Sequence, residues 1–456
     1  MNNTTKRAYV LYAVVALFFV GMGILIYSFI ANGAQWATSK ANRHLYSDGS
    51  ISAAGSVYDA NGEILAQTVD GKRKYNSDVT IRRSTLHTVG DLNGYIATGV
   101  QYTYRNTLTG YDFVDGILSI VSYGKGNDIH LTINSEICKT AYKALNGRKG
   151  AVGVYNYKTG KIVCMVSSPN YDPKNKPSDI DSNKKYEGVY LNRVISGLYT
   201  PGSTFKVITA VSAIENLPDI YSQTFKCTGE YSTGDGIVKC NGVHGTVNFE
   251  QALNHSCNSA FAKIAVELGS ERLTATANEL GFNIKLDVNG IASPAKSSFD
   301  VSKAAKVDLG WAGIGQYTTL VSPYHMMSIM GCIANGGTAT EPYVVDYVQT
   351  QNGRKTETKS EAFTEISLPA DVANKMKKLL RSNVVNYYKD STFPGLEMCG
   401  KTGTAQIDDG EPHSWFVGFS QNESTPYAVA VVVENGGTGL AAAGVVANKV
   451  MQAVCK

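Results

Sequence analysis

Hydrophobic and polar residues follow three successive patterns along the chain. Residues 8–31 carry no charged side chain and are nearly all apolar. At about 1.5 Å per residue, a helix of this length crosses the ~30 Å core of a bilayer. Residues 51–145 alternate short apolar runs with Tyr, Thr and Gly, which is typical of short strands and turns. Asn61-Gly62 lies between two such runs and predicts a hairpin.

Residues 146–456 have the third pattern, with strand-like runs at both ends and helical patterns between them. Helices are predicted over residues 441–454 and over residues 248–269, where Asn248 and Gln251 occupy capping-box positions and Gly269 follows as a helix-ending glycine. Strands at both ends with helices between them predict an α+β domain, built on one antiparallel sheet covered by helices. The five predicted strands are residues 151–155, 161–166, 398–406, 415–419 and 427–433.

The charges around the apolar segment predict its orientation. Lys6 and Arg7 lie just before it, whereas the next basic residue is Lys40. Positively charged flanks stay on the cytoplasmic side. A cleaved signal peptide is the alternative, but its apolar core ordinarily spans only ~7–15 residues. We therefore expect a cytoplasmic tail, a single-pass transmembrane helix and an extracytoplasmic linker at residues 1–7, 8–31 and 32–50.

Composition limits the classes of partner. A length of 456 residues is enough for two or three domains with a sizeable core. Charged residues make up 18% of the chain, the formal net charge is +4, and no long basic run is present. Nothing in the sequence therefore indicates a nucleic-acid partner.

The strongest chemical pattern is Ser203-Thr204-Phe205-Lys206. Residues three apart on a helix lie on one face, so the Lys206 amine can take the proton of the Ser203 hydroxyl and make it a nucleophile. Tyr199-Thr200-Pro201-Gly202 precedes the motif and breaks regular structure. Ser203 is therefore predicted to lie at the start of a helix, where free backbone N–H groups favour developing negative charge.

Two further motifs follow in the chain, Ser256-Cys257-Asn258 and Lys401-Thr402-Gly403. Each motif alone is a weak signal, but the three in this order are the signature of penicillin-binding proteins and serine β-lactamases. The chain resembles this family and, within it, the class B (monofunctional) peptidoglycan D,D-transpeptidases. Further stretches carry the same resemblance, at residues 54–62, 168–173, 192–206 and 413–419.

The resemblance implies an architecture and a set of partners. Residues 51–145 are expected to form a small, β-rich, non-catalytic pedestal (dimerisation-like) domain, although Ala54 stands where an arginine is usual. Residues 146–456 are expected to form a penicillin-binding/serine β-lactamase-like transpeptidase domain on the extracytoplasmic side of the cell membrane. The implied partners are peptidoglycan stem peptides, β-lactam antibiotics and a polytopic membrane glycan polymerase. No cofactor is implied.

The resemblance also implies roles for the motif residues. Ser203 is expected to attack the carbonyl between the last two D-alanines of a stem peptide and form an acyl-enzyme, with Lys206 as the base. Ser256 is expected to relay a proton towards the leaving amine, and Asn258 to hold Lys206 and the substrate. An oxyanion hole is expected from the backbone N–H groups of Ser203 and Thr404. The substrate is expected to lie along an edge strand and to bind Lys401, Thr402, Gly403 and Thr404.

Three related activities stay open. A D,D-carboxypeptidase would pass the acyl group to water, a β-lactamase-like enzyme would need a group that activates water for rapid deacylation, and a β-lactam-sensing protein would couple acylation to cytoplasmic machinery. The anchor, the pedestal and the class B stretches favour a transpeptidase over a β-lactamase. A cytoplasmic tail limited to residues 1–7 disfavours a sensor.

Four residues near the second motif form a separate pattern. Cys227, Cys240 and His244 precede Cys257, which is the middle residue of that motif. A disulfide between Cys227 and Cys240, a tetrahedral zinc site with a Cys3His ligand set, and free packed thiols are all compatible with this spacing.

Overall fold

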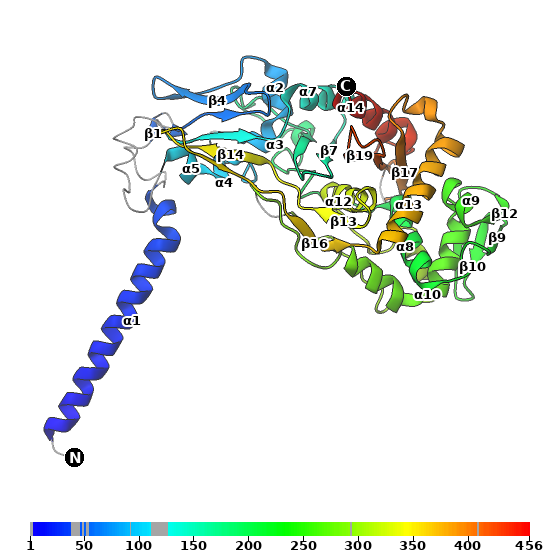
Figure 1. Cartoon of the computed structure of the whole chain (residues 1–456), viewed down its shortest axis with the longest axis horizontal. Helices are drawn as coiled ribbons and strands as arrows, with labels where there is room; N and C mark the ends of the chain where they lie inside the picture. The colour runs from blue at the N-terminus through cyan, green and yellow to red at the C-terminus, as the bar shows by residue number, and fades with distance from the viewer. Residues whose placement is uncertain are drawn as a thin grey trace.

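The computed structural model describes residues 3–37, 46–47, 50–51, 54–91, 93–110, 126–291, 294–407 and 410–456. Helix α1 (Asn3–Ala37) projects from one end of the molecule (Figure 1). Among the described residues it is the one helix long and apolar enough to cross a membrane, over Thr4–Gly33, and none of its most apolar window is buried. The chain is therefore a single-pass membrane protein. Residues 38–45 and 48–49 of the expected linker lie outside the described residues.

The second part of the molecule is a six-stranded sheet in the order β15-β14-β6-β3-β4-β5. Strands β3 and β4 form an antiparallel hairpin, which confirms the turn predicted at Asn61-Gly62, and β6 runs parallel to β3. Two of the strands come from much later in the chain than residue 146, so this sheet joins distant segments. Its strands are β3 (Val57–Tyr58), β4 (Ile64–Val69), β5 (Lys72–Tyr75), β6 (Asp128–Leu131), β14 (Val345–Gln349) and β15 (Lys355–Glu357).

A buried ion pair joins this sheet's helices to the larger part of the molecule. Arg82 lies in the short helix α2, and its guanidinium makes two hydrogen bonds of 2.7 Å to the carboxylate of Asp172. Arg82 also donates to the backbone oxygens of Asn76 and Ser77. The short helices here are α2 (Val79–Ser84), α3 (Leu86–Val89), α4 (Val100–Thr103) and α5 (Arg105–Thr109).

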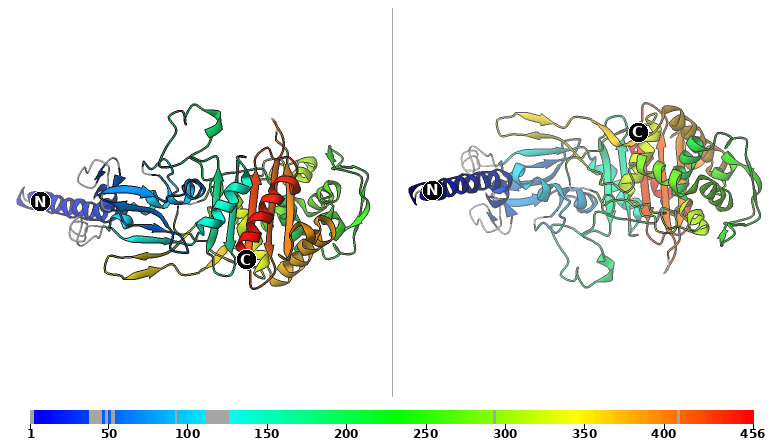
Figure 2. Two further views of the ribbon diagram at one scale, coloured as in Figure 1. Left: turned by 90° about the horizontal axis from the view of Figure 1, so that it is seen from above. Right: turned by 90° about the horizontal axis from the view of Figure 1, so that it is seen from below.

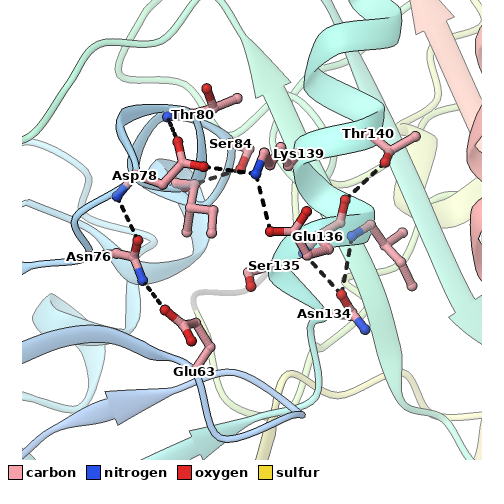
Figure 3. Close-up of polar contacts among 12 residues, drawn as sticks. Glu63, Asn76, Asp78, Thr80, Ser84, Asn134, Ser135, Glu136, Lys139 and Thr140 are labelled. Atoms are coloured by element: carbon pink, nitrogen blue, oxygen red, sulfur yellow. Dashed lines mark hydrogen bonds and ion pairs between the residues drawn. The ribbon is translucent and has the colours of Figure 1, made fainter.

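A second, more exposed link lies beside the first. Figure 3 shows Lys139 between two carboxylates, at 2.8 Å from Asp78 and 3.2 Å from Glu136. Asp78 is the N-cap of α2, whereas Lys139 and Glu136 belong to α7 (Ser135–Leu145). The cluster therefore ties α2 to a helix that packs on the larger sheet.

The third part is a five-stranded sheet in the order β17-β18-β19-β7-β8, with every neighbouring pair antiparallel. Its strands coincide with the five predicted runs, so the antiparallel sheet expected from the sequence is confirmed. Helices α7 and α14 lie over one face in the left view of Figure 2, and α12 lies on the opposite face in the right view. The elements are β7 (Gly150–Asn156), β8 (Ile162–Ser168), β17 (Met398–Ala405), β18 (His413–Ser420), β19 (Tyr427–Val433), α12 (Pro323–Ala334) and α14 (Val445–Val454).

A helical region forms the end of the molecule farthest from α1 (Figure 1). The capping box of Asn248 and Gln251 is confirmed, but the single helix predicted over residues 248–269 is wrong. The chain leaves α9, turns through Ser256 with a φ of 52°, and restarts in α10. Gly269, with a φ of 77° and a ψ of 167°, breaks the helical backbone where the helix end was predicted, and a second helical run follows it within α10. The helices are α8 (Lys206–Asn216), α9 (Phe249–Asn254), α10 (Asn258–Glu279), α11 (Lys306–Ala312) and α13 (Ala370–Ser382).

Small two-stranded pieces complete the fold. Strand β9 (Thr224–Cys227) pairs with β12 (Gly245–Asn248), and β10 (Glu230–Ser232) pairs with β11 (Ile237–Lys239). They lie beside α9 and α10 at the far end of the molecule (Figure 1). The other short strands are β1 (Tyr46–Ser47), β2 (Ser50–Ile51), β13 (Thr338–Thr340) and β16 (Ala362–Ser367).

Candidate active site

Ser203 and Lys206 lie one turn apart at the start of a buried helix. A 3-10 turn over Gly202–Phe205 leads directly into α8, so the helix start predicted at Ser203 is confirmed. Residues 206–214 of α8 are all buried, and the helix packs against α10 and α13. This packing holds the two side chains in a fixed relation.

Lys206 reaches four oxygen atoms with its amine. Its Nζ lies 3.1 Å from Ser203 Oγ and 2.7 Å from Asn258 Oδ1. It also lies 2.6 Å from the backbone oxygen and 3.1 Å from Oγ of Ser256. The Phe261 ring covers it, with its centroid 5.7 Å away. Among the described residues no carboxylate lies within ion-pair distance, so this buried amine is surrounded by neutral groups.

The hydroxyl of Ser256 connects two lysines. Its Oγ lies 3.1 Å from Lys206 Nζ and 2.9 Å from Lys401 Nζ. The φ of 52° at Ser256 places a non-glycine residue in the left-handed region, a conformation that persists only where the surroundings hold it. Here Lys206 and Lys401 hold both sides of the turn, so a proton can pass between the two amines through one hydroxyl.

Lys401 lies on β17, which is an edge of the five-stranded sheet as predicted. The turn that carries Ser203 packs closely against β17, and a glycine on each segment, Gly202 and Gly403, allows the contact. A Cβ at Gly202, whose φ is +52°, would lie 2.7 Å from the Thr404 oxygen, and a Cβ at Gly403 would lie 2.8 Å from the Pro201 oxygen. Only glycine allows this approach, which brings the backbone at Ser203 beside the backbone at Thr404.

Burial changes the protonation of both lysines. Loss of solvation, and then the positive charge of Lys401, lower the pKa of Lys206 well below 10.5, although Cys257 and Cys240 oppose the shift. Burial lowers the pKa of Lys401 to about 7. A lysine whose charged form is disfavoured in this way can act as a base near neutral pH.

A cleft of about 600 Å³ opens above these groups. Five of the predicted residues line it: Ser203, Ser256, Asn258, Thr402 and Thr404. Lys206 and Lys401 are fully buried beneath it. Other lining residues carry no sequence motif that singles them out, and they include Trp311, Gln316, Tyr387, Tyr388, Gln406 and Thr438.

Tyr388 is the most closely involved of the residues that the sequence did not reveal. Its hydroxyl accepts a 2.9 Å hydrogen bond from the Thr402 N–H and lies 2.8 Å from Thr402 Oγ1. Asn383 donates to the Gly400 oxygen from the same π-helical turn, Asn383–Tyr388. Side chains therefore hydrogen-bond part of the free edge of β17, along which the described residues supply no neighbouring strand.

The four residues of the separate cysteine and histidine pattern converge beside the cleft. The ligand atoms of Cys227, Cys240, His244 and Cys257 all lie within 4.8 Å of one another. All eight cysteines of the chain lie in the described residues, and each is free. Cysteine and histidine are the ligand types of structural zinc sites. Among the described residues, this cluster brings such ligands together.

The family profile "Penicillin binding protein transpeptidase domain" matches residues 150–454. The chain belongs to this family. The match covers the five-stranded sheet and all three motifs, so the resemblance drawn from the motifs is confirmed, as is the α+β fold.

Similar proteins cover almost the whole chain. The peptidoglycan D,D-transpeptidase PbpA of Mycolicibacterium smegmatis is 26% identical over 97% of this chain and 96% of its own length. A penicillin-binding protein A structure from Mycobacterium tuberculosis, a ceftriaxone acyl-enzyme complex, has 26% identity and a TM-score of 0.79 over 89% of this chain and 99% of its own. The D,D-transpeptidase domain of a peptidoglycan glycosyltransferase from Eggerthella lenta has 28% identity and a TM-score of 0.74 over 88% and 99%.

Proposed function

We propose that the protein is a serine-type peptidoglycan D,D-transpeptidase that cross-links the cell wall and is inhibited covalently by β-lactams. The observation that carries this proposal is the 3.1 Å separation between Ser203 Oγ and the buried amine of Lys206, in a domain of the transpeptidase family. The name of the mycolicibacterial relative supports the reaction. The acyl-enzyme complex of the mycobacterial relative supports inhibition by β-lactams.

Acylation begins at Ser203. The neutral Lys206 amine takes the hydroxyl proton, and Oγ forms a bond to the carbonyl carbon between the two terminal D-alanines. The negative charge that develops on the carbonyl oxygen is stabilised by the backbone N–H groups of Ser203 and Thr404. Their proximity is supported by the glycine contacts between the two segments. Loss of one such donor typically costs about 3 kcal/mol of transition-state stabilisation.

The leaving D-alanine needs a proton as its C–N bond breaks. Ser256 Oγ lies between the amines of Lys206 and Lys401, so the proton taken from Ser203 reaches the leaving amine through this hydroxyl. Asn258 holds Lys206 by accepting its hydrogen bond. The substrate lies along β17, where Gly403 allows close approach, and its terminal carboxylate binds to Lys401, Thr402 and Thr404.

A reaction with natural substrates tests the proposal. The full chain in detergent is mixed with a lipid-linked donor carrying a D-Ala-D-Ala stem peptide and with an acceptor stem peptide, and the products are separated by mass spectrometry. We expect cross-linked peptides together with released D-alanine, and neither from Ser203→Ala. Release of D-alanine without cross-links would instead indicate a carboxypeptidase.

The domain division and the topology belong to the same proposal. The tail at residues 1–7 is cytoplasmic and residues 8–31 span the membrane, because basic residues flank only the N-terminal end of the apolar segment. Residues 51–145 form most of the pedestal, and residues 146–456 form the transpeptidase domain outside the cell membrane. Labelling of an added cysteine in the linker by an impermeant maleimide in whole cells tests this orientation.

A polytopic membrane glycan polymerase is the proposed partner. The class B resemblance supports it, and α1 is the element of this chain that would meet a second membrane protein within the bilayer. Photo-crosslinking from residues within α1 in cells, followed by mass spectrometry of the adduct, tests this partnership. Adducts with lipids alone would contradict it.

A further inference from the structure

Three cysteines and one histidine direct their side chains at a common centre beside the catalytic motifs. The Sγ atoms of Cys240 and Cys257 lie 3.9 Å apart. His244 Nδ1 lies 3.5 Å from Cys227 Sγ and 3.6 Å from Cys240 Sγ. All four of these atoms lie within 4.8 Å of one another.

The separations of 3.5, 3.6 and 3.9 Å match three edges of a zinc-centred tetrahedron. Bonds of about 2.3 Å to sulfur and about 2.0–2.1 Å to nitrogen at tetrahedral angles place two sulfurs about 3.8 Å apart, and a sulfur and a nitrogen about 3.5 Å apart. We propose that Cys227, Cys240, His244 and Cys257 form a structural zinc site. The protein supplies all four ligands, which is the arrangement of structural rather than catalytic zinc.

The groups around the cluster suit zinc-bound thiolates. The backbone N–H of Asn258 donates to Cys240 Sγ at 3.2 Å, and that of Ala260 donates to Cys257 Sγ at 3.5 Å. Such outer hydrogen bonds orient ligands and offset their negative charge. On binding, each of the three thiols releases its proton to solvent, and His244 binds as a neutral ring through Nδ1, so the filled site carries one net negative charge.

The local fold explains why a metal is useful here. The ligands before α9 come from two-stranded pieces, with Cys227 at the end of β9, Cys240 just after β11 and His244 just before β12. An isolated two-stranded piece is only marginally stable in water. A zinc ion that joins these ends to Cys257 would supply folding free energy that their small core does not.

The site also reaches the cleft. Cys240 lines the cleft wall, and the neighbouring Lys239 oxygen accepts a 3.0 Å hydrogen bond from Asn258 Nδ2. Cys257 lies between Ser256 and Asn258, so zinc would fix the turn that positions both side chains against Lys206. This effect on catalysis rests on the proposed function, whereas metal binding itself does not.

Metal content of the full chain tests the site directly. Wild type, Cys240→Ser and Cys455→Ser are purified in detergent without chelator. Their zinc content is measured by inductively coupled plasma mass spectrometry. Cys240 and Cys455 are both half-buried, which makes the second variant a matched control. We expect about one zinc per chain in wild type and in Cys455→Ser, and a large loss in Cys240→Ser.

A measurement on the wild-type chain alone tests the zinc site even if Cys240→Ser does not fold. Zinc is removed with a chelator under reducing conditions and Co²⁺ is added; we expect the absorption bands of thiolate-bound tetrahedral cobalt. Wild-type protein without stoichiometric zinc and without these cobalt bands would overturn the proposal. A Cys227–Cys240 disulfide found in peptides from freshly purified protein would overturn it as well.

Acylation by penicillin separates this inference from the proposed function. We expect zinc removal to slow acylation of Ser203 by about tenfold or more, the size of effect common when the supports of a site are lost, and zinc return to restore it. Protein that holds one zinc but is not acylated at Ser203 would overturn the proposed function and leave the zinc site intact.

Discussion

Two buried basic side chains in this molecule are held in opposite ways. Arg82, where the six-stranded sheet meets the larger domain, makes a bidentate ion pair with Asp172, and the two side chains are only 8% and 7% exposed. Lys206, at the floor of the cleft, is fully buried, and the oxygens that its amine contacts in the described part of the chain belong to hydroxyl, amide and carbonyl groups. The difference between the two sites is one carboxylate.

That carboxylate decides whether each basic side chain stays charged. The hydrogen bonds from Asp172 raise the pKa of Arg82. Burial raises the pKa of Asp172, but the hydrogen bonds from Arg82 and from the Lys174 N–H, with the charges of Arg82 and Arg83, together hold this pKa below its ordinary value. Among the residues that the structure describes, Lys206 has no carboxylate partner; burial, and then the charge of Lys401, lower its pKa. The paired Arg82 therefore stays charged and stabilises the structure, whereas the unpaired Lys206 amine is neutral more readily and can accept a proton.

The largest expected effect comes from removing the unpaired amine of Lys206. Lys206→Met should lower the rate of acylation by penicillin about 10²–10⁴-fold, because the general base is lost. It should lower the free energy of unfolding by less than Arg82→Met does, since hydrogen bonds are lost but no buried charge is left without its ionic partner. Fluorescent-penicillin labelling kinetics and calorimetry check both, with Lys263→Met, an exposed lysine of α10, as control. Acylation at the wild-type rate would contradict the base assignment.

Removing the paired cation should have the reverse profile. Arg82→Met leaves Asp172 buried without its partner and should lower the free energy of unfolding by about 3–5 kcal/mol. Molecules that remain folded should be acylated at the wild-type rate. The neighbouring Arg83 is exposed, so Arg83→Met is the matched control for calorimetry. A slow acylation rate in folded Arg82→Met would show that the two regions are not independent.

The pH dependence of acylation sharpens the comparison. Lys206 is a base only when neutral, and its pKa is lowered well below 10.5. The acylation rate should therefore rise with pH, level off well below pH 10.5, and fall by about tenfold per pH unit on the acid side of the lowered pKa. Rates are measured with circular dichroism as a check that the protein stays folded. A rise centred near pH 10.5 would indicate an ordinary lysine.

A smaller effect is expected from the tyrosine that holds the edge strand. Tyr388→Phe removes the hydroxyl that accepts from the Thr402 N–H, a loss of about 1 kcal/mol, and should weaken acylation by about fivefold without unfolding the domain. Tyr102, which lies in α4 and does not line the cleft, is 43% exposed, so Tyr102→Phe should acylate as wild type. Equal acylation rates for the two variants would contradict the role of the Tyr388 hydroxyl in holding the edge strand.

The smallest effect is expected at the exposed ion pair of Figure 3. Lys139 bridges Asp78 and Glu136, but solvent screens charges at such positions. Lys139→Ala should therefore leave the unfolding temperature almost unchanged, in contrast to Arg82→Met. A loss of stability comparable to that of Arg82→Met would mean that burial is not what separates the two ion pairs.

Sequence reasoning predicted what depends on local pattern. The five strands, the helix start at Ser203 and the capping box at Asn248 follow from periodicity and turn residues, and all are confirmed. The break at Ser256 was missed, because the residues from Phe249 through Leu268 keep a helical pattern and only tertiary contacts hold the left-handed turn.

Features that depend on long-range pairing could not be read from the sequence. Tyr388 reaches Thr402 through a π-helical turn that no motif marks. Strands β14 and β15 join a sheet whose other strands precede them by more than two hundred residues. The convergence of Cys227 with Cys257 likewise appears only in three dimensions. The motif residues themselves were singled out by spacing, while their roles stay predictions.

The most direct test of the central claim is the intact mass of the full chain, in detergent, followed over hours after addition of penicillin G. We predict that wild type gains the mass of one penicillin, that the adduct persists, and that peptide mapping places it on Ser203. Ser203→Ala should gain nothing and Lys206→Met should gain the adduct far more slowly. An adduct on Ser203→Ala, or none on wild type, would contradict the claim that a buried, unpaired lysine makes Ser203 the nucleophile.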